Sequence, residues 1–476
     1  MKILLIHPAK VGALGLQDMT SLEPLALELV AASLADHDVR LLDLRKSDTL
    51  AQDLDDFRPD ACGISACFTT EVYAAQRIAA AVKEWNPRCF TFVGGHHPSL
   101  SPQDCHSSQV DAVVCGEGEV TTPELAQCLA QGGDLRQVRG LYLNQDGGQL
   151  STGPREMIAS LDDLPAPRRD LTRQHRHDYF WGFRRPLALL ETARGCPYRC
   201  NFCSVWCFYN GRVRAMSPER VLREVVSVPE KHIFFTDDNF LLSVQRAEEL
   251  AALLKREGVR KTYGIQARTD TVAQHPELMA QWKEIGLDNV FLGIEKLTED
   301  GLRELNKRNA LENNEQAIEV LKGLEIGFTG NFIVDPNWDH AQFADLREFV
   351  TSRQLFNSSF TILTPLPGTL LHEELRGQLT SQDYELFDLW HAVLPTRLDL
   401  REFYREFAGL WLAATQSRPR VSLLRRLVRV AKQVITREAS WRHLRAALKA
   451  TRSLQDPLKY LLAHQPRTPA ARQERL

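Results

Sequence analysis

Short apolar runs alternate with amphipathic helical patterns through the first 150 residues of the chain. The apolar runs, each followed by a loop, are Ile3–Ile6, Val39–Leu42, Ala61–Ile64, Phe90–Val93 and Ala112–Val114. Four of them lead into segments with apolar residues at helical spacing, namely Pro24–Leu34, Leu50–Phe57, Glu71–Trp85 and Pro123–Leu129. This alternation predicts a parallel sheet covered by helices on both faces, a doubly wound α/β domain over residues 1–150.

Loops that follow the strands of such a sheet are its expected ligand-binding edge, because ligands bind outside the carboxyl ends of the strands. The loops there are His7–Lys10, Ser65–Thr70, Gly94–Pro98 and Gly116–Glu119. The last two, Gly-Gly-His-His-Pro and Gly-Glu-Gly-Glu, carry glycine where a backbone would approach a ligand closely.

A second alternating region begins after residues 151–186, which have no clear pattern and are predicted to be a linker or a cap without its own core. Its strand candidates are Leu187–Thr192, His232–Thr236, Tyr263–Ala267, Asn289–Ile294, Gly327–Val334 and Ser359–Leu363. Six strand–helix units in a row predict a partial six-stranded barrel of the TIM type over residues 187–379, with its chemistry at the carboxyl ends of the strands. Polar residues that follow its first four strands are Cys196, Asp238, Arg268 and Glu295.

The region from 380 to 476 is predicted to be helical, and its charge differs from that of the rest of the chain. From Arg418 to the end there are 15 Lys and Arg against 3 Asp and Glu, although the whole chain has a net charge of −3. The stretch Val421–Ile435 alternates apolar and cationic residues at helical spacing. It predicts either a helix packed on the barrel with a solvated basic face, or a segment that lies on an anionic membrane surface. Nucleic-acid binding is not expected, because the cations alternate with Leu and Val rather than with aromatic residues.

Composition places the chain among ordinary globular proteins, with 43% hydrophobic and 25% charged residues. The first apolar run is too short for a signal peptide, and no run is long enough to span a bilayer. We therefore expect a cytoplasmic protein, with or without peripheral contact at the inner face of the membrane. In that compartment a tight group of cysteines favours a metal site over disulfides.

Cys196, Cys200 and Cys203 lie on one predicted loop with CxxxCxxC spacing. Three thiolates at this spacing can ligate three irons of one 4Fe-4S cluster and leave the fourth iron open. A zinc site is the alternative, but zinc loops usually pair two CxxC halves and no second half follows here. Cys207 leaves a further alternative open, since a fourth ligand would make the cluster a plain electron carrier.

The segment Leu187–Thr369 resembles the radical S-adenosylmethionine superfamily, in CxxxCxxC with an aromatic residue, Phe202, before the last cysteine. The resemblance implies that the three cysteines bind a 4Fe-4S cluster. It also implies that Asp238, in Thr-Asp-Asp-Asn, contacts the amino group of S-adenosylmethionine, and that Arg268 and Glu295 contact its carboxylate and ribose. A surface ion pair is the alternative role for each of the latter two residues.

Residues 1–150 resemble the cobalamin-binding domain of class B radical methyltransferases, in Ile-Ser-Ala-Cys-Phe-Thr-Thr, Val-Gly-Gly-His-His-Pro and Cys-Gly-Glu-Gly-Glu. The cobalamin contacts that this resemblance implies are Ser65, Thr69, Thr70, Gly94, Gly95, His96, Glu117, Gly118 and Glu119. The Asp-x-His-x-x-Gly loop whose histidine ligates cobalt in other cobalamin proteins is absent. His96 is expected to form hydrogen bonds in its loop rather than to ligate cobalt.

The combined resemblance implies an enzyme that abstracts hydrogen from an unactivated carbon and transfers methyl to it from methylcobalamin. An electron donor of the flavodoxin or ferredoxin type is the implied partner. Segments similar to those of the hopanoid C-3 methylase group are Ser21–Val30, Cys203–Trp206 and Leu363–Thr369. The expected substrate is a small molecule or lipid, with a hopanoid as the first candidate. Relatives of the same architecture methylate or cyclise tetrapyrroles or methylate natural products, and these activities are the alternatives.

Overall fold

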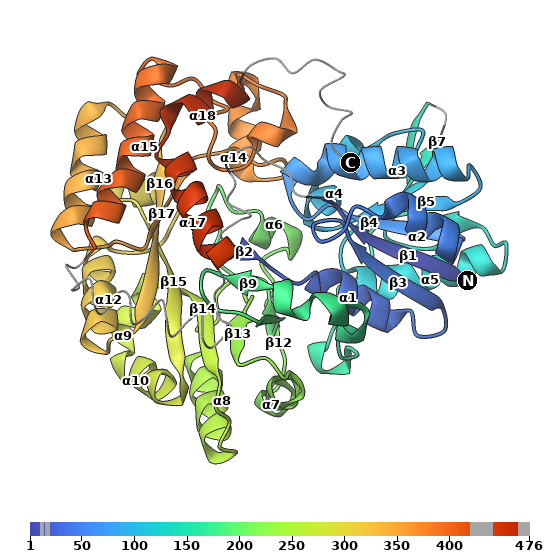
Figure 1. Ribbon diagram of the computed structural model, residues 1–476, viewed down its shortest axis with the longest axis horizontal. Coiled ribbons are helices and arrows are strands. Elements are labelled where there is room, and N and C mark those ends of the chain that lie inside the picture. The colour runs from blue at the N-terminus through green and yellow to red at the C-terminus, as the bar shows by residue number, and fades with distance from the viewer. Residues whose placement is uncertain (10–13, 15–19, 146, 419–440, 465–476) are drawn as a thin grey trace.

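The computed structural model describes the chain except for residues 10–13, 15–19, 146, 419–440 and 465–476. Two large sheets, one from each half of the described chain, form two lobes that lie side by side (Figure 1). The fold is the mixed α/β arrangement that the alternating pattern predicts.

The N-terminal lobe is built on a seven-stranded sheet of order β3-β1-β4-β5-β6-β7-β8. Its strands are β1 (Lys2–His7), β3 (Asp38–Asp43), β4 (Ala61–Ser65), β5 (Phe90–Gly94), β6 (Ala112–Val114), β7 (Leu141–Gln145) and β8 (Gly148–Ser151). Its helices are α1 (Leu25–Ser33), α2 (Leu50–Phe57), α3 (Val72–Trp85), α4 (His96–Leu100) and α5 (Gly118–Ala130).

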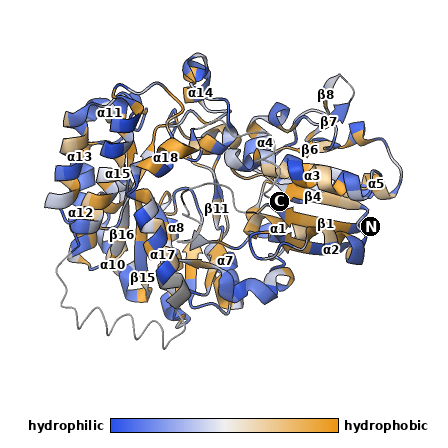
Figure 2. Cartoon of the chain, turned by 45° about the horizontal axis from the view of Figure 1, so that its top comes forward, coloured by the Kyte–Doolittle hydropathy of each residue, from blue (hydrophilic) through white to orange (hydrophobic). Residues whose placement is uncertain are grey.

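Side chains alternate between two cores on the opposite faces of this sheet. Leu4 and Ile6 of β1 pack in the core that includes residues of α2 and α3, whereas Ile3 and Leu5 pack in the core that includes residues of α1 and α5. The hydrophobic strands therefore lie between two layers of helix (Figure 2). Helical cover on both faces confirms the predicted doubly wound arrangement.

The five predicted strands are parallel, and the sequence analysis did not predict two further antiparallel strands at one edge of the sheet. Strands β3, β1, β4, β5 and β6 are parallel, but β7 pairs antiparallel with β6, and β8 with β7. Gly147 and Gly148, with φ of 98° and 151°, lie where the chain turns from β7 to β8. Asp-Gly between two short strands is a recognised hairpin signal that the strand–helix reading passed over.

The C-terminal lobe contains six parallel strands in sequential order. They are β10 (Leu187–Leu190), β13 (His232–Phe235), β14 (Thr262–Arg268), β15 (Leu287–Glu295), β16 (Gly327–Val334) and β17 (Ser358–Ile362). The helices between them are α7 (Pro218–Ser227), α8 (Val244–Arg256), α9 (Thr269–Gln274), α10 (Pro276–Ile285), α11 (Glu299–Glu304), α12 (Leu311–Gly323) and α13 (His340–Ser352). Within the described chain β10 and β17 are the two edges of this sheet, so the barrel is open, as predicted.

Further helices follow the barrel and pack on it. They are α14 (Leu370–Leu375), α15 (Leu400–Gln416), α17 (Trp441–Leu454) and α18 (Pro457–Ala463). Short 3-10 helices span Thr69–Glu71, Pro102–Cys105, Leu135–Gln137, Leu161–Asp163, Arg169–Asp178, Arg376–Gln378 and Tyr384–Leu386. No helix in the part of the chain described is long and apolar enough to cross a membrane. The predicted basic stretch Val421–Ile435 lies outside the described residues.

Strand β9, just before the barrel, and helix α1 each contact the other lobe, and a side chain of β9 enters the barrel. Strand β9 (Phe180–Trp181) pairs with β2 (Thr20–Ser21) of the N-terminal lobe. The Trp181 ring stacks on Phe291 of β15, with ring centroids 4.5 Å apart, and meets Phe234 of β13 edge-on. Leucines of α1 also share a small apolar cluster with leucines of β10. The segment predicted as a linker or cap therefore supplies part of the barrel interior.

Glu28 of α1 is fully buried where α1 meets residues 151–186, the segment between the two lobes. Burial, and secondarily the neighbouring charge of Glu23, raise the pKa of Glu28 to about 8, although Thr172 donates a hydrogen bond of 2.5 Å to its carboxylate. The folded protein therefore holds a proton that the unfolded chain releases above its ordinary carboxylate pKa. Folded stability consequently falls as the pH rises from about 4.5 toward about 8.

The substitution Glu28→Gln is expected to remove this component of the pH dependence. Glutamine is neutral at every pH and keeps an oxygen that can accept from Thr172. Urea unfolding between pH 5 and pH 9 should show a smaller loss of stability in the variant than in the wild type, on the order of 1 kcal/mol or more. Glu248→Gln, at an exposed position of α8, is the control. An identical pH dependence in Glu28→Gln and the wild type would contradict the assignment.

Candidate cofactor site

The three predicted cluster cysteines lie on the loop that follows β10, at the carboxyl end of the barrel strands. The loop begins at β11 (Ala193–Arg194), which pairs antiparallel with β12 (Arg214–Ala215), and includes the single turn α6 (Val205–Phe208). Gly195 has φ of 92°, and a Cβ there would lie 2.0 Å from the carbonyl oxygen of Arg212. Glycine is therefore required where the chain turns into the cysteine motif.

Contacts from other segments hold the backbone of this loop. The Asn201 amide donates to the carbonyl of Leu305 (3.1 Å), and Leu371 donates back to the carbonyl of Asn201 (3.0 Å). The Trp206 indole donates to the carbonyl of Cys200 at 2.8 Å. The loop is thus fixed by the segments that follow β15 and β17 as well as by its own turn.

Burial raises the pKa of all three thiols, that of Cys203 to about 12. The positive charges of Lys307 and Arg268 act in the opposite direction on Cys196 and Cys200. Cys200 is buried, whereas Cys196 and Cys203 are partly exposed. Cations near the loop suit thiolate ligation, because they stabilise the anionic form.

Cys207 has a different environment from the other three cysteines. Its thiol lies 3.7 Å from the carbonyl oxygen of Cys203, and burial is the main cause that raises its pKa, followed by the charge of Glu373 on α14. Cys207 lies on α6, after the three-cysteine motif, and a separate thiol remains the prediction for it.

Asp238, Arg268 and Glu295 are brought to the same end of the barrel as the cysteine loop. The Asp238 carboxylate accepts a hydrogen bond of 3.1 Å from the amide of Gly195, directly before Cys196. Burial raises the pKa of Asp238 to about 6, with smaller contributions from the charges of Glu191 and Asp237. A carboxyl group so close to the cysteine loop is in place to meet a ligand bound there.

Arg268 and Glu295 are each already engaged within the site. The Arg268 guanidinium pairs with Asp270 at 2.7 Å. It also lies 3.7 Å from the ring centroid of Tyr198, a residue between the first two cysteines in the sequence. Glu295, at φ 67°, accepts from Lys307 at 2.7 Å. Both residues form ion pairs, as the alternative prediction had it, but both pairs lie beside the cysteine loop rather than on a remote surface.

Sequence reasoning missed Tyr198 and Lys307. Lys307 is buried and donates to the carbonyl of Gly293 (2.8 Å) as well as to Glu295. It follows α11, between two strands, in a segment where no motif marks it. The one available signal was Tyr198 itself, an aromatic side chain inside the cysteine motif.

The loops at the carboxyl edge of the N-terminal sheet face the cysteine loop. His96 shares a hydrogen bond of 2.9 Å between its Nε2 and the Ser204 hydroxyl, and its ring stacks on Phe208 at 4.7 Å. Burial lowers the pKa of His96 to about 4, so it is neutral at pH 7. His96 is thus a hydrogen-bonding loop residue, as the sequence predicts.

The other residues predicted to contact cobalamin lie in the loops at the carboxyl edge of the N-terminal sheet. Thr69 is buried and bonds to His97 Nδ1 at 3.1 Å, while Ser65 contacts the Cys67 thiol at 3.4 Å. Gly94 ends β5, and a Cβ on Gly95 would lie 2.8 Å from the carbonyl oxygen of Ala66, so these loops pack tightly. Thr70 and Gly118 lie in the same edge loops, at the starts of the helices that follow.

Glu117 and Glu119 take part in ion pairs that cross between the lobes. The Arg194 guanidinium lies 2.7 Å from Glu117 and 2.5 Å from Glu119, and Arg214 is 2.7 Å from Glu117. The sequence analysis expected these carboxylates to contact cobalamin, and the structure places them against the base of the cysteine loop.

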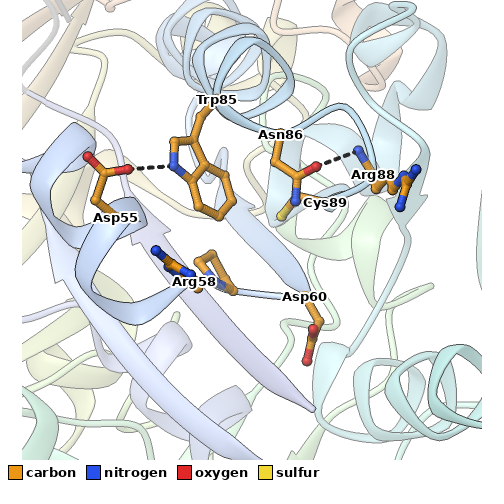
Figure 3. Close-up of a pocket in the computed structure, with 8 residues that line it drawn as sticks. Asp55, Arg58, Asp60, Trp85, Asn86, Arg88 and Cys89 are labelled. Atoms are coloured by element: carbon orange, nitrogen blue, oxygen red, sulfur yellow. Dashed lines mark hydrogen bonds between the residues drawn. The ribbon is translucent and has the colours of Figure 1, made fainter.

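A separate hollow of about 540 Å³ lies at the opposite edge of the N-terminal sheet (Figure 3). Trp85 donates to Asp55 at 2.8 Å on its wall, and Arg58, Asp60 and Cys89 also line it. These residues precede or border the amino ends of β4 and β5. The hollow therefore belongs to the far side of the sheet and not to the candidate site.

Comparison with known proteins decides the family. Residues 18–126 match the B12 binding domain, and residues 190–350 match the radical SAM superfamily. The hopanoid C-3 methylase of Methylococcus capsulatus is 38% identical over 415 residues, covering 85% of this chain and 78% of that protein. The chain belongs to the cobalamin-dependent radical S-adenosylmethionine methyltransferases.

Two more distant proteins are similar to this methyltransferase, one in sequence and one in structure. The anaerobic magnesium-protoporphyrin IX monomethyl ester cyclase of Rubrivivax gelatinosus is 27% identical over 369 residues, covering 75% of this chain and 65% of that protein. The structure of the radical enzyme OxsB with aqua-cobalamin and S-adenosylmethionine bound superposes with a TM-score of 0.70 at 17% identity, covering 86% of this chain and 66% of that one. The second similarity supports the fold.

The residues present in the methyltransferase fit the cofactors of its family. Cys196, Cys200 and Cys203 supply three thiols on one loop, the donor type that a 4Fe-4S cluster takes. At the N-terminal edge, the glycine loops and the exposed Phe68 side chain, 68% accessible, offer backbone and apolar surface to a large ring system.

The cysteine assignment predicts different outcomes for two substitutions in this methyltransferase. Cys207→Ala should retain the cluster, with iron and sulfide content and the broad visible absorbance unchanged after anaerobic reconstitution, and should still release 5′-deoxyadenosine. Cys200→Ala should lose both the cluster and the cleavage of S-adenosylmethionine. The result that would revive the electron-carrier alternative is loss of the cluster in Cys207→Ala.

Proposed function

We propose that this enzyme methylates an unactivated carbon of a hopanoid, at C-3, or of a similar polycyclic lipid. The observation that carries the proposal is the 38% identity to a hopanoid C-3 methylase over 85% of the chain. The similarity spans both lobes, so it includes the loops of the N-terminal sheet as well as the barrel.

In this proposal, Cys196, Cys200 and Cys203 hold the cluster, and Asp238, Arg268 and Glu295 hold S-adenosylmethionine. The support is their common position at the mouth of the barrel, with Asp238 and Arg268 in contact with residues of the cysteine loop. Release of the Asp270 and Lys307 pairs toward a ligand would free one cation and one carboxylate for its charged and ribose groups.

For cobalamin we propose the edge loops of the N-terminal sheet. The glycines and hydroxyls assigned to it are Ser65, Thr69, Thr70, Gly94, Gly95 and Gly118. Three more residues border the same site and also contact the cysteine loop or the strand before it: His96, Glu117 and Glu119. Together the cofactors supply a hydrogen-abstracting radical and a methyl donor, while the protein orients them and excludes water. The electron is proposed to come from a flavodoxin- or ferredoxin-type donor.

The C-terminal helices support a peripheral contact with the inner face of the membrane, which would bring a cytoplasmic enzyme to its lipid. Leu448 of α17 and Leu458 and Leu462 of α18 are 60%, 60% and 58% exposed, and α18 is largely hydrophobic (Figure 2). The exposed cations of α17 are Arg445, Lys449 and Arg452, none of which pairs with a carboxylate among the described residues. Exposed leucines on helices that also carry exposed cations suit an anionic lipid surface.

A tetrapyrrole is the second candidate substrate. The specific observation in its favour is the similarity to the magnesium-protoporphyrin ester cyclase, which covers 75% of the chain. The lower identity, 27% against 38%, places it second.

Lipid analysis of a deletion strain tests the substrate. Loss of the gene should remove one methylated species of a polycyclic triterpenoid, leaving its unmethylated parent, and complementation should restore it. Complementation with a Cys200→Ala copy is the matched control and should not. An unchanged triterpenoid profile together with an altered tetrapyrrole would reject the lipid in favour of the second candidate.

Vesicle binding tests the membrane contact. The purified enzyme should sediment with vesicles that contain anionic phosphatidylglycerol and much less with pure phosphatidylcholine, since each cation near the surface contributes roughly 1 kcal/mol. Leu458→Asp with Leu462→Asp should weaken binding at least several-fold. Val226→Asp, at a 61% exposed position on α7, is the matched control and should bind as the wild type does. Equal sedimentation of the leucine variant and the control would refute a role for this face.

A further inference from the structure

The N-terminal lobe contacts the cysteine loop at both ends of the loop. Before the motif, Arg194 extends from β11 to Glu117 and Glu119, on the loop between β6 and α5. After the motif, Ser204 and Phe208 contact His96, at the start of α4 after β5. Two successive edge loops of the cobalamin-binding sheet thus hold the two ends of one short segment that carries all three cluster cysteines.

The first of these contacts is a buried charge network. Arg194 is 4% exposed, and Glu117 and Glu119 are each 9% exposed. Arg194 also lies 2.7 Å from Glu191, and Arg214 adds a second cation to Glu117. A buried guanidinium whose fork meets several carboxylates fixes orientation as well as distance, and removal of one partner leaves a charge uncompensated.

The second contact is directional in another way. The His96 and Phe208 rings are nearly parallel, 12° apart, and the hydrogen bond of 2.9 Å to Ser204 fixes the imidazole in its plane. Ser204 directly follows Cys203. A shift of the β5 loop would therefore be transmitted to the last cysteine of the motif.

We infer that Arg194 and His96 are positioning residues, which set the distance between the cobalamin-binding edge and the cysteine loop and thereby couple radical formation to methyl transfer. The inference rests on the proposed methyl transfer. A carbon radical receives a methyl group only if the donor lies close to it, and small misplacements of reacting groups cost large factors in rate. The Arg194 and His96 contacts connect the two lobes, and they therefore fix the distance between the methyl donor and the site of the carbon radical.

Substitution of Arg194 in the reconstituted holoenzyme tests whether its contacts with Glu117 and Glu119 couple the two reactions. Arg194→Lys keeps the positive charge and loses the planar fork. We expect the ratio of 5′-deoxyadenosine released to methylated product to rise several-fold, with iron content and cluster absorbance unchanged. Hydrogen–deuterium exchange should also quicken in residues 116–120 and 193–204. Arg353→Lys is the matched control, because Arg353 forms a partly exposed pair with Glu315 on the outside of the barrel.

Each outcome supports or overturns the inference. An unchanged product ratio in Arg194→Lys overturns it, even if exchange quickens, because the pair would then be structural only. If Arg194→Lys loses its cluster, Ser204→Ala takes its place, since it removes the hydrogen bond to His96 and leaves every proposed cofactor contact intact; an unchanged ratio there overturns the inference. Failure of the substrate proposal has a different signature: no methylated triterpenoid from the wild type, with the exchange difference still present.

Discussion

The turn at Gly195 is the constraint on which the site depends. Its positive φ carries the chain from β11 into the cysteine motif, its lack of a side chain allows the carbonyl of Arg212 to pack against it, and its amide donates to Asp238. One residue thereby links the start of the cluster loop to the end of the second barrel strand. The cysteines reach the mouth of the barrel because this turn closes there, and the groups predicted to hold the second cofactor are arranged around it.

Much of the architecture was readable from the sequence because alternation and spacing are local properties. Apolar runs placed all six barrel strands, and the cysteine spacing marked the loop. What the sequence did not reveal depends on contacts between distant segments. Lys307 reaches Glu295 only through the fold, and Trp181 enters the barrel from a segment without a recognisable pattern. The antiparallel β7–β8 hairpin is not part of the strand–helix alternation, so that pattern does not predict it.

The site predictions divide along the same line. Cys196, Cys200 and Cys203 share one loop at the mouth of the barrel, and the Asp238 carboxylate contacts it. Glu117 and Glu119 were expected at the cofactor, yet their carboxylates meet Arg194. An acidic residue in a glycine loop has the same sequence signature in either role, and only the partner across the lobe interface distinguishes them.

The placement of Trp181 has a consequence for how the molecule can be divided. Its ring covers Phe234 and Phe291 at the base of the barrel, and its strand pairs with Thr20–Ser21 of the other lobe. A chain cut just before Leu187 would leave those rings and the inner leucines of β10 open to water. The interior of the barrel is completed by residues that precede it, so a barrel fragment starting at Leu187 is expected to be less stable than one that keeps Trp181 and the segment around it.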